Sequence, residues 1–329
     1  MQTPDFEGGR INILVTPPVT EAHKAQLTAA CPDGLFRYVP AKEATPADVE
    51  HAEVIIGNIP RELLAYCKRL KFLQLNFAGT DGFPEAMPEG AQLANASGAY
   101  GLAISEHMLG MLFAVIKKLY LYHDNQRESR WHDEGGVTSV YGSVVLSVGM
   151  GDIGGEFLKK CRALGAYTIG IRRTQREKPE YADEVNTLDA LDELLPRADV
   201  VALSLPSSPE TDGLMDARRL ALMKRGAVLI NVGRGSAVDG FALAEAANAE
   251  RIHAALDVTN PEPLPEDHPL WTARNVHITP HISGFFHLEE TLNRIIRISA
   301  ENLRRYAAGE PLLNLVDAAT GYRRGENRA

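Results

Sequence analysis

A glycine-rich turn between an apolar segment and a helix-forming segment constrains the fold more than any other feature of the chain. Residues 144–148 are an apolar run, and GMGDIG follows directly at 149–154 and opens a segment with helical periodicity. In this context the glycines permit a tight turn and let a pyrophosphate approach the backbone closely. The pyrophosphate oxygens can then accept hydrogen bonds from the amides at the helix N-terminus. We therefore predict a dinucleotide site, rather than an ordinary strand–helix turn, formed by Gly149, Gly151 and Gly154.

Short apolar segments alternate with helical segments along the rest of the chain. This alternation favours parallel sheets covered by helices on both faces, and 329 residues leave room for two domains. The sequence therefore predicts an α/β protein with two doubly wound parallel-sheet domains. The predicted strands are 11–16, 35–39, 54–57, 72–77, 144–148, 167–171, 200–203, 227–232, 252–256 and 276–278, and the predicted helical segments are 21–30, 60–70, 102–122, 152–164 and 289–308.

The end of the strand at 167–171 bears on which dinucleotide is bound. NAD enzymes place a carboxylate there, roughly 20 residues after the glycines, to bind the ribose hydroxyls. Here the strand ends in Arg172, Arg173 and Thr174, and no acid stands at that place. A guanidinium can bind a 2′-phosphate that a carboxylate would repel. The sequence predicts that NADP is preferred over NAD; the alternative is a solvated basic turn, which is common at strand ends.

Composition and charge argue against several other classes of protein. The formal net charge of −9 is unfavourable for a general binder of nucleic acid. Cys31, Cys67 and Cys161 are far apart, so we expect neither a disulfide framework nor a metal site. No stretch approaches the roughly 20 apolar residues that span a bilayer, and the N-terminal residues lack a signal-peptide pattern. We therefore expect a cytoplasmic protein without a membrane partner.

Motifs along most of the chain resemble those of the D-isomer-specific 2-hydroxyacid dehydrogenases. The resemblance does not rest on the glycines alone, because several segments occur in the family's order. They are AGTD at 78–81, NASGAYGLAISE at 95–106, GMGDIG at 149–154, LPSSPET at 205–211, NVGRG at 231–235, DVTNPEPLP at 257–265 and TPHISG at 279–284.

The resemblance implies a catalytic triad of Arg234, Glu262 and His281, and the chemistry of 2-keto acid reduction supports each choice. Such a reaction needs a cation for the carboxylate, an acid for the carbonyl oxygen and a group that orients this acid. Arg234 offers a planar fork, His281 can donate a proton near neutral pH, and Glu262 can bind the other imidazole nitrogen. Each residue alone could be an ordinary loop residue. The prediction rests on their joint occurrence at the carboxyl ends of predicted parallel strands.

The resemblance also assigns binding roles to smaller residues. Ala78 and Gly79, together with Arg234, are expected to bind the substrate carboxylate, because small side chains leave backbone amides accessible. Asp152 and Ile153 are expected to face the pyrophosphate of the cofactor, and Asp257 is expected to reach its nicotinamide carboxamide. The predicted cofactor contacts in the second half of the chain are Leu205, Pro206, Thr211, Val232, Gly233, Asp257, Ser283 and Gly284.

The resemblance further implies an architecture and a reaction. A Rossmann dinucleotide domain at 98–287 would be inserted into a flavodoxin-like substrate domain made of 1–97 and 288–329, with the active site between them and a homodimer built through the dinucleotide domain. The expected reaction is hydride transfer between NAD(P)H and a small 2-keto acid, such as glyoxylate or hydroxypyruvate, giving a D-2-hydroxy acid. The alternative is a non-catalytic NAD(P)H-sensing protein of the same fold. Phe285-Phe286-His287 departs from the family pattern. These residues could narrow the site, cap the nicotinamide or pack beneath the last helix, and we expect packing.

Overall fold

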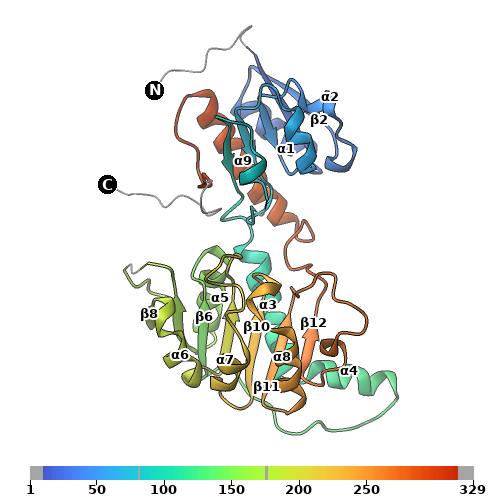
Figure 1. Ribbon diagram of the computed structural model, residues 1–329, viewed down its shortest axis with the longest axis vertical. Coiled ribbons are helices and arrows are strands. Elements are labelled where there is room, and N and C mark those ends of the chain that lie inside the picture. The colour runs from blue at the N-terminus through green and yellow to red at the C-terminus, as the bar shows by residue number, and fades with distance from the viewer. Residues whose placement is uncertain (1–9, 81, 175–176, 318–329) are drawn as a thin grey trace. The chain divides into compact units, whose positions relative to one another are not determined.

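The chain forms two compact units, which are described separately. The computed structural model describes residues 10–80, 82–174 and 177–317. One unit is Gly101–His287, and the other combines Met1–Tyr100 with Leu288–Ala329 (Figure 1). Residues 1–9, 81, 175–176 and 318–329 of the predicted domains, Asp81 of the AGTD motif among them, lie outside the described residues.

The unit Gly101–His287 is built on a seven-stranded sheet in which all neighbouring strands are parallel. The spatial order is β8 (Glu184–Asn186), β7 (Tyr167–Ile171), β6 (Val144–Val148), β9 (Val200–Leu203), β10 (Ala227–Asn231), β11 (Ile252–Leu256) and β12 (Val276–Ile278). Its first six strands have the order of the Rossmann fold, which reverses direction beside β6. Ligands of such sheets bind outside the carboxyl ends of the strands at this reversal.

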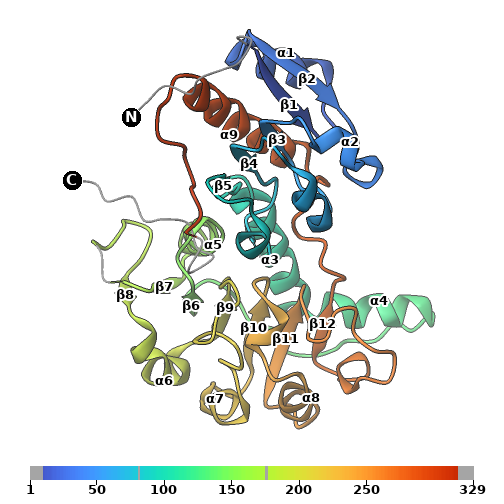
Figure 2. The same cartoon turned by 45° about the horizontal axis from the view of Figure 1, so that its top comes forward.

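Helices cover both faces of this sheet (Figure 2). On one face, buried leucines of three helices pack with Leu146, Val201 and Leu229 of the central strands in one apolar core. These helices are α6 (Leu191–Leu194), α7 (Ala217–Leu222) and α8 (Gly240–Asn248). On the opposite face, α3 (Gly101–Ile116) and α5 (Asp152–Ala163) pack against each other.

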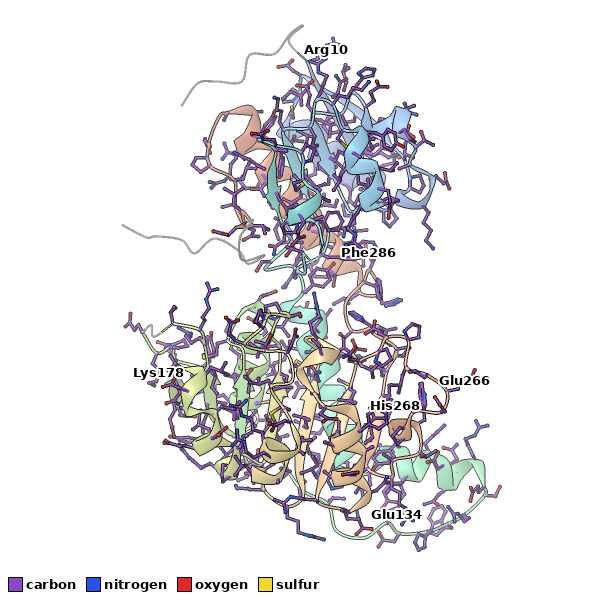
Figure 3. All side chains as sticks on the ribbon, in the orientation of Figure 1. Arg10, Glu134, Lys178, Glu266, His268 and Phe286 are labelled. Carbon is purple, nitrogen blue, oxygen red and sulfur yellow. The ribbon has the colours of Figure 1, made fainter. Side chains whose placement is uncertain are left out.

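The helix predicted at 102–122 is interrupted, which corrects the sequence prediction. After α3 ends, Lys118 adopts a left-handed conformation with φ of 56°, and α4 (Leu119–Arg127) begins. The apolar periodicity continues through the break, so the pattern alone could not reveal it. Figures 1 and 2 show α4 extending beyond the sheet next to β12. Glu134, labelled in Figure 3, lies on the segment that returns from α4, where its carboxylate accepts from Asn125 Nδ2 at 2.6 Å.

The other unit is built on a five-stranded parallel sheet. Its spatial order is β2 (Gly34–Tyr38), β1 (Ile11–Val15), β3 (Val54–Ile56), β4 (Phe72–Gln74) and β5 (Gln92–Ala94), which is the flavodoxin-like order. Its α-helices are α1 (Glu21–Ala30), α2 (Pro46–Val49) and α9 (Glu289–Ala307). The helical segment predicted at 60–70 forms a 3₁₀ helix at Arg61–Tyr66. The two parallel sheets confirm the predicted α/β class.

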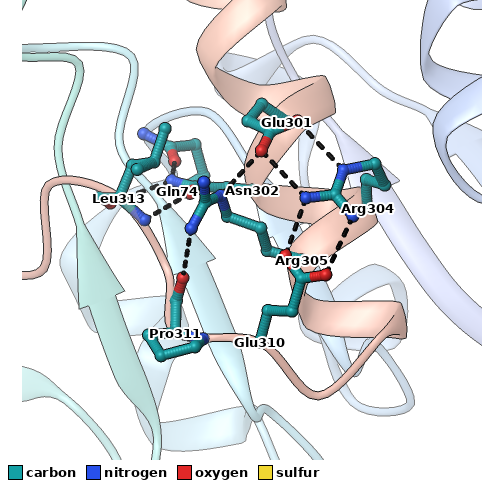
Figure 4. A network of polar contacts seen from close by, with 8 residues as sticks. All are labelled: Gln74, Glu301, Asn302, Arg304, Arg305, Glu310, Pro311 and Leu313. Carbon is teal, nitrogen blue, oxygen red and sulfur yellow. Dashed lines mark hydrogen bonds and ion pairs between the residues drawn. The ribbon is translucent and has the colours of Figure 1, made fainter.

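The helix α9 is anchored to this five-stranded sheet although it comes from the end of the chain. Asn302 is fully buried, and its Nδ2 donates to Gln74 Oε1 of β4 at 2.7 Å (Figure 4). Its Oδ1 accepts from the amide of Leu313 at 2.7 Å. Because a buried amide group without partners costs about 1–3 kcal/mol, these bonds fix α9 and the segment after it against β4.

The three cysteines are buried free thiols. Burial raises the pKa of the Cys161 thiol to about 12 and that of the Cys67 thiol to about 11, so these residues are poor nucleophiles. In the described ranges, no group of three or more His, Cys, Asp or Glu side chains could hold a metal ion. Nor is any helix in these ranges both long and apolar enough to span a membrane.

Candidate active site

The glycine-rich turn joins β6 to α5 with no room for side chains at two positions. Gly149 has a φ of +106°, a conformation that favours glycine. A Cβ on Gly154 would lie 1.9 Å from the Gly149 carbonyl oxygen, so only glycine lets α5 start this close to β6. A Cβ on Gly151 would meet no atom within 4 Å. The backbone at the start of α5 is therefore open to a phosphate group.

Asp152 and Ile153 are the first residues of α5. The carboxylate of Asp152 accepts from the amide of Gly101 at 2.7 Å, and Gly101 is the first residue of α3. This bond satisfies one of the amide donors that the N-terminus of a helix leaves unpaired. Asp152 therefore ties α3 to α5, and its predicted contact with the pyrophosphate stays a prediction.

The segment predicted to select NADP follows β7 at the surface. Arg172 is half-buried, and Arg173 and Thr174 are exposed. Glu210, in the loop after β9, has a pKa below its usual range, mainly because the Ser208 hydroxyl donates to it and also because Arg173 is nearby. Since β7 and β9 flank β6 in the sheet, Arg173 and Glu210 come from the two segments on either side of the glycine-rich turn.

The loops after β9 and β10 pack directly on each other. Thr211 closes the first loop, because its hydroxyl donates to the Pro206 carbonyl at 2.8 Å. A Cβ on Gly233 would lie 2.5 Å from the carbonyl oxygen of Leu205, so the second loop touches the first there. The amide of Val232 donates to Leu203 O at 3.1 Å and extends the pairing of β10 with β9. The fold thus gathers these predicted cofactor contacts at the carboxyl end of the sheet.

Arg234 follows Gly233 on a backbone that Asn231 holds in place. Asn231 Nδ2 donates to the Arg234 carbonyl at 2.9 Å, and its Oδ1 accepts from the Gly233 amide at 3.1 Å. Arg234 is half-buried, and its Nη1 donates to the Gly233 carbonyl at 2.8 Å. A Cβ on Gly235 would lie 1.9 Å from Thr259 O, so the loop of Arg234 abuts the loop that follows β11.

His281 and Glu262 form a direct hydrogen bond. Nδ1 of His281 lies 2.6 Å from Oε1 of Glu262, and the two side chains are 46% and 43% exposed. Because a carboxylate only accepts, Nδ1 carries the proton in this contact. The other ring nitrogen, Nε2, has no hydrogen-bond partner among the described residues. The imidazole is therefore oriented from one side and accessible on the other.

Asp257 holds the loop that carries His281. It is 1% exposed, and its two carboxylate oxygens accept from the amides of Ile282 and Ser283 at 3.0 Å each. Its carbonyl oxygen accepts from the amide of His281 at 2.8 Å, which supports the φ of 51° at His281. Burial by itself would raise the pKa of Asp257, but hydrogen bonds from Ser283, Thr279 and the loop amides outweigh it and lower this pKa, so the carboxylate stays charged.

The two residues after Ser283 are only partly covered by their surroundings. Gly284 is half-buried and Phe285 is 44% exposed. The ring of Phe285 lies 6.3 Å from the imidazole of His281 and is tilted by 53° to it. Phe285 therefore lies next to the imidazole of His281, and the expected packing of this segment beneath the last helix stays a prediction.

The two residues predicted to bind the substrate carboxylate belong to the other unit. Ala78 and Gly79 are half-buried and follow β4. The carbonyl of Ala78 accepts from Asn95 Nδ2 at 2.7 Å, and the amide of Ala96 donates to the Phe77 carbonyl at 2.9 Å. These bonds fix the turn that presents Ala78 and Gly79 at the carboxyl end of their own sheet.

Two residues without a predicted role, His107 and Thr279, also join the site. The hydroxyl of Thr279 lies 2.5 Å from Asp257 Oδ1 and 3.1 Å from His107 Nε2. Thr279 stands within the TPHISG motif, which was a usable signal. Nothing in the sequence joins His107, on α3, to a loop 172 positions away.

Comparison with known proteins identifies relatives along most of the chain. The model of a family described as "D-isomer specific 2-hydroxyacid dehydrogenase, NAD binding domain" matches residues 109–283. A hydroxypyruvate reductase from Blautia hydrogenotrophica is 29% identical over 277 residues, which cover 79% of this chain and 84% of that protein. The chain also matches D-3-phosphoglycerate dehydrogenases but spans about half of their length, for example 54% of the enzyme from Methanocaldococcus jannaschii at 28% identity.

Two solved structures extend this similarity to the fold. A D-isomer specific 2-hydroxyacid dehydrogenase family protein from Aeromonas salmonicida is 30% identical, with a TM-score of 0.84 over 94% of this chain and 99% of the other. A D-isomer specific 2-hydroxyacid dehydrogenase from Xanthobacter autotrophicus, in complex with NADPH and MES, is 30% identical, with a TM-score of 0.78 over 95% and 99%. The resemblance drawn from the sequence motifs is therefore confirmed.

Proposed function

The chain belongs to the D-isomer-specific 2-hydroxyacid dehydrogenase family, and from this premise we propose that Arg234, Glu262 and His281 carry out its reaction. It is an NAD(P)-dependent oxidoreductase that transfers a hydride between the dinucleotide and a 2-keto or D-2-hydroxy acid. The observation that carries the proposed roles is the 2.6 Å contact between His281 Nδ1 and Glu262 Oε1.

His281 acts as the acid in reduction and as the base in oxidation. The bound nicotinamide supplies the hydride that the keto carbon accepts. His281 holds a proton on Nε2 and passes it to the keto oxygen, which becomes the hydroxyl. Glu262 accepts from Nδ1–H throughout, so it stabilises the imidazolium before transfer and fixes the tautomer that remains afterwards. In the opposite direction, the unprotonated Nε2 takes the hydroxyl proton.

Arg234 binds the carboxylate of the substrate and polarises its keto oxygen. The guanidinium presents several N–H donors in one plane, which suits two neighbouring oxygen atoms. Its backbone is held by Asn231, so the side chain starts from a fixed position beside the loop that follows β11. We assign the backbone amides of Ala78 and Gly79 to the same carboxylate.

The glycine-rich turn holds the pyrophosphate, and the segment after β7 holds the adenosine ribose. The open backbone at Gly151 fits a phosphate group at the N-terminus of α5. Arg172 and Arg173 suit a 2′-phosphate, so we propose that NADP is preferred over NAD. The Xanthobacter autotrophicus relative, which was solved with NADPH, supports this preference.

Replacing Arg172 and Arg173 together with alanine is expected to lower kcat/KM for NADPH by about 10–100-fold, because charge-assisted hydrogen bonds to the 2′-phosphate are lost. The value for NADH should change less than about threefold, because NADH has no phosphate at this position. Steady-state kinetics with both dinucleotides checks this. Lys178→Ala is the matched control, since Lys178 lies just beyond the turn and donates to the Ala182 carbonyl at 3.0 Å. Equal losses with both dinucleotides would refute the assignment.

We propose glyoxylate and hydroxypyruvate as substrates, because a small 2-keto acid needs only the groups assigned above. The hydroxypyruvate reductase from Blautia hydrogenotrophica supports this choice. The test follows loss of NADPH absorbance with a panel of small 2-keto acids, and turnover with one of them is expected. Tight NADPH binding without turnover of any acid would favour the non-catalytic sensing protein, for which the relatives offer no support.

We propose that two copies of the protein associate through one surface of the unit Gly101–His287. This surface is the arm, which is formed by α4 and the segment after it. Trp131 is fully exposed on this arm, and Leu119 and Val137 are about half exposed. Tryptophan is enriched at the buried centres of protein–protein interfaces, so a fully exposed tryptophan suits such a surface. A homodimer through the unit Gly101–His287 would cover them.

Trp131→Ser is expected to raise the dimer dissociation constant by about 30-fold, the effect of losing a central aromatic contact worth about 2 kcal/mol. Sedimentation velocity over a concentration series measures the change. Trp271→Ser is the control, because Trp271 is also exposed but lies outside the arm. If the wild type sediments as a monomer at all concentrations, the homodimer is wrong.

We also propose a cytoplasmic location. Cys31, Cys67 and Cys161 are free thiols, which suit a reducing compartment. Cell fractionation followed by immunodetection tests this location directly.

A further inference from the structure

A hydrogen-bonded chain connects helix α3 with the loop of His281. His107 Nε2 lies 3.1 Å from Thr279 Oγ1, which in turn lies 2.5 Å from Asp257 Oδ1. We propose that His107 is a positioning residue, which keeps the His281 imidazole in place through Thr279 and Asp257. This inference rests on the proposed role of His281 as the acid.

The direction of the hydrogen bonds follows from the number of protons available. The hydroxyl of Thr279 has one proton to donate, and its neighbours are Asp257 Oδ1 at 2.5 Å, His107 Nε2 at 3.1 Å and Met111 Sδ at 3.9 Å. A carboxylate is the strongest acceptor of the three and also the nearest, whereas a thioether is a weak one. Thr279 therefore donates to Asp257 and accepts from Nε2–H of His107, which sets the tautomer of His107.

Asp257 connects the hydrogen-bonded chain to the catalytic loop, which is the loop that carries His281. Its side chain is fully buried, and the donors that replace water around it include Thr279 and the amides of Ile282 and Ser283. Buried charge is tolerated only when it is hydrogen-bonded, so these donors act as one set. If the Thr279 hydroxyl turns away, the carboxylate loses a donor and the loop amides lose a fixed acceptor. The position of the His281 backbone then becomes less defined.

His107 can supply this support because α3 is itself fixed at its start. Gly101, the first residue of α3, donates to Asp152 at the start of α5, and His107 lies less than two turns further along. The side chain of His107 is 23% exposed, so most of it is held by its surroundings. One helix thus contacts both the glycine-rich turn and the loop of His281, and His107 provides a hydrogen bond of this helix to the loop.

Two variants of His107 separate positioning from general stability. His107→Leu removes the Nε2–H donor, and His107→Gln keeps an N–H donor at the same place along the side chain. The leucine variant is expected to lower kcat about tenfold while the dissociation constant for NADPH changes less than about twofold, because small displacements of a catalytic group cost rate. The glutamine variant should regain kcat to within about threefold of the wild type. Glu106→Gln, an exposed neighbour on α3, is the control.

Hydrogen–deuterium exchange provides a readout that does not depend on turnover. In His107→Leu, peptides that contain the amides of residues 281–283 should exchange faster than in the wild type, whereas peptides of the glycine-rich turn should not. Thr279→Val should have the same effect, and adding His107→Leu to it should lower kcat no further.

The outcomes separate this inference from the proposed function. Unchanged exchange at 281–283, or equal kcat in the leucine and glutamine variants, would overturn the role of His107 even if the enzyme turns over 2-keto acids. Multiplicative losses in the double variant would overturn it as well. If the wild type turns over no 2-keto acid, the proposed function fails, while faster exchange in His107→Leu would still establish the support of the loop.

Discussion

His281→Ala is expected to lower kcat for the reduction of a 2-keto acid by about 10²–10⁴-fold, the usual contribution of a general acid. The variant loses the imidazole that carries the proton, but it keeps the backbone amide that donates to the Asp257 carbonyl at 2.8 Å. The loop should therefore keep its place. Steady-state kinetics measures kcat, and fluorescence titration should give a dissociation constant for NADPH within about twofold of the wild type.

Two further variants sharpen this test. Glu262→Gln keeps an oxygen that accepts from Nδ1 of His281 but removes the charge that stabilises the imidazolium, so a smaller loss of about tenfold is expected. His287→Ala removes an exposed histidine on the same segment and should leave kcat within about twofold. A kcat in His281→Ala that stays within tenfold of the wild type would place the proton donor elsewhere.

Strands buried on both faces could be predicted from the sequence, but two of the four edge strands, β8 and β5, could not. The apolar runs at β6 and β7 match the predicted bounds, because strands covered by helices on both faces need continuous apolar residues. β8 has only half-buried residues and contains glutamate and asparagine. β8 is a strand because it pairs with β7, and a local sequence pattern does not reveal this pairing. β5 is likewise only three residues long and lies at the edge of its sheet.

The candidate site, like the fold, could be predicted from the sequence only in part. Motif resemblance brought Arg234, Glu262 and His281 together, and the structure sets two of them in contact. The hydrogen bonds that hold the loop of His281 could not be predicted. His107, Asp257 and Thr279 come from separate segments, and they meet only when α3 packs against the sheet. The motif assigns Asp257 a contact with the cofactor, which stays a prediction. Its support of the loop depends on burial and on hydrogen-bond donors, which a sequence motif does not record.

Arg234→Lys is expected to lower kcat/KM for a 2-keto acid by about 10²–10³-fold although the positive charge is kept. A guanidinium can donate to the carboxylate and to the keto oxygen at once, whereas an ammonium is a single point of charge on a flexible stem. Because Asn231 fixes the backbone through the Arg234 carbonyl, the substitution should not displace the loop. The loss should therefore appear in kcat as well as in KM, since the keto oxygen gains negative charge only as the hydride arrives.

The matched control for this change lies at the other end of the same strand. Arg225 is exposed just before β10, and Arg234 follows the end of β10, so Arg225→Lys makes the same chemical change away from the carboxyl ends of the strands. It should leave kcat/KM within about twofold, and both variants should bind NADPH as the wild type does. If Arg234→Lys retained full kcat/KM, the reaction would not depend on hydrogen bonds from the planar guanidinium of Arg234 to the substrate. The carboxylate would then have to be bound by the backbone amides of Ala78 and Gly79 without it.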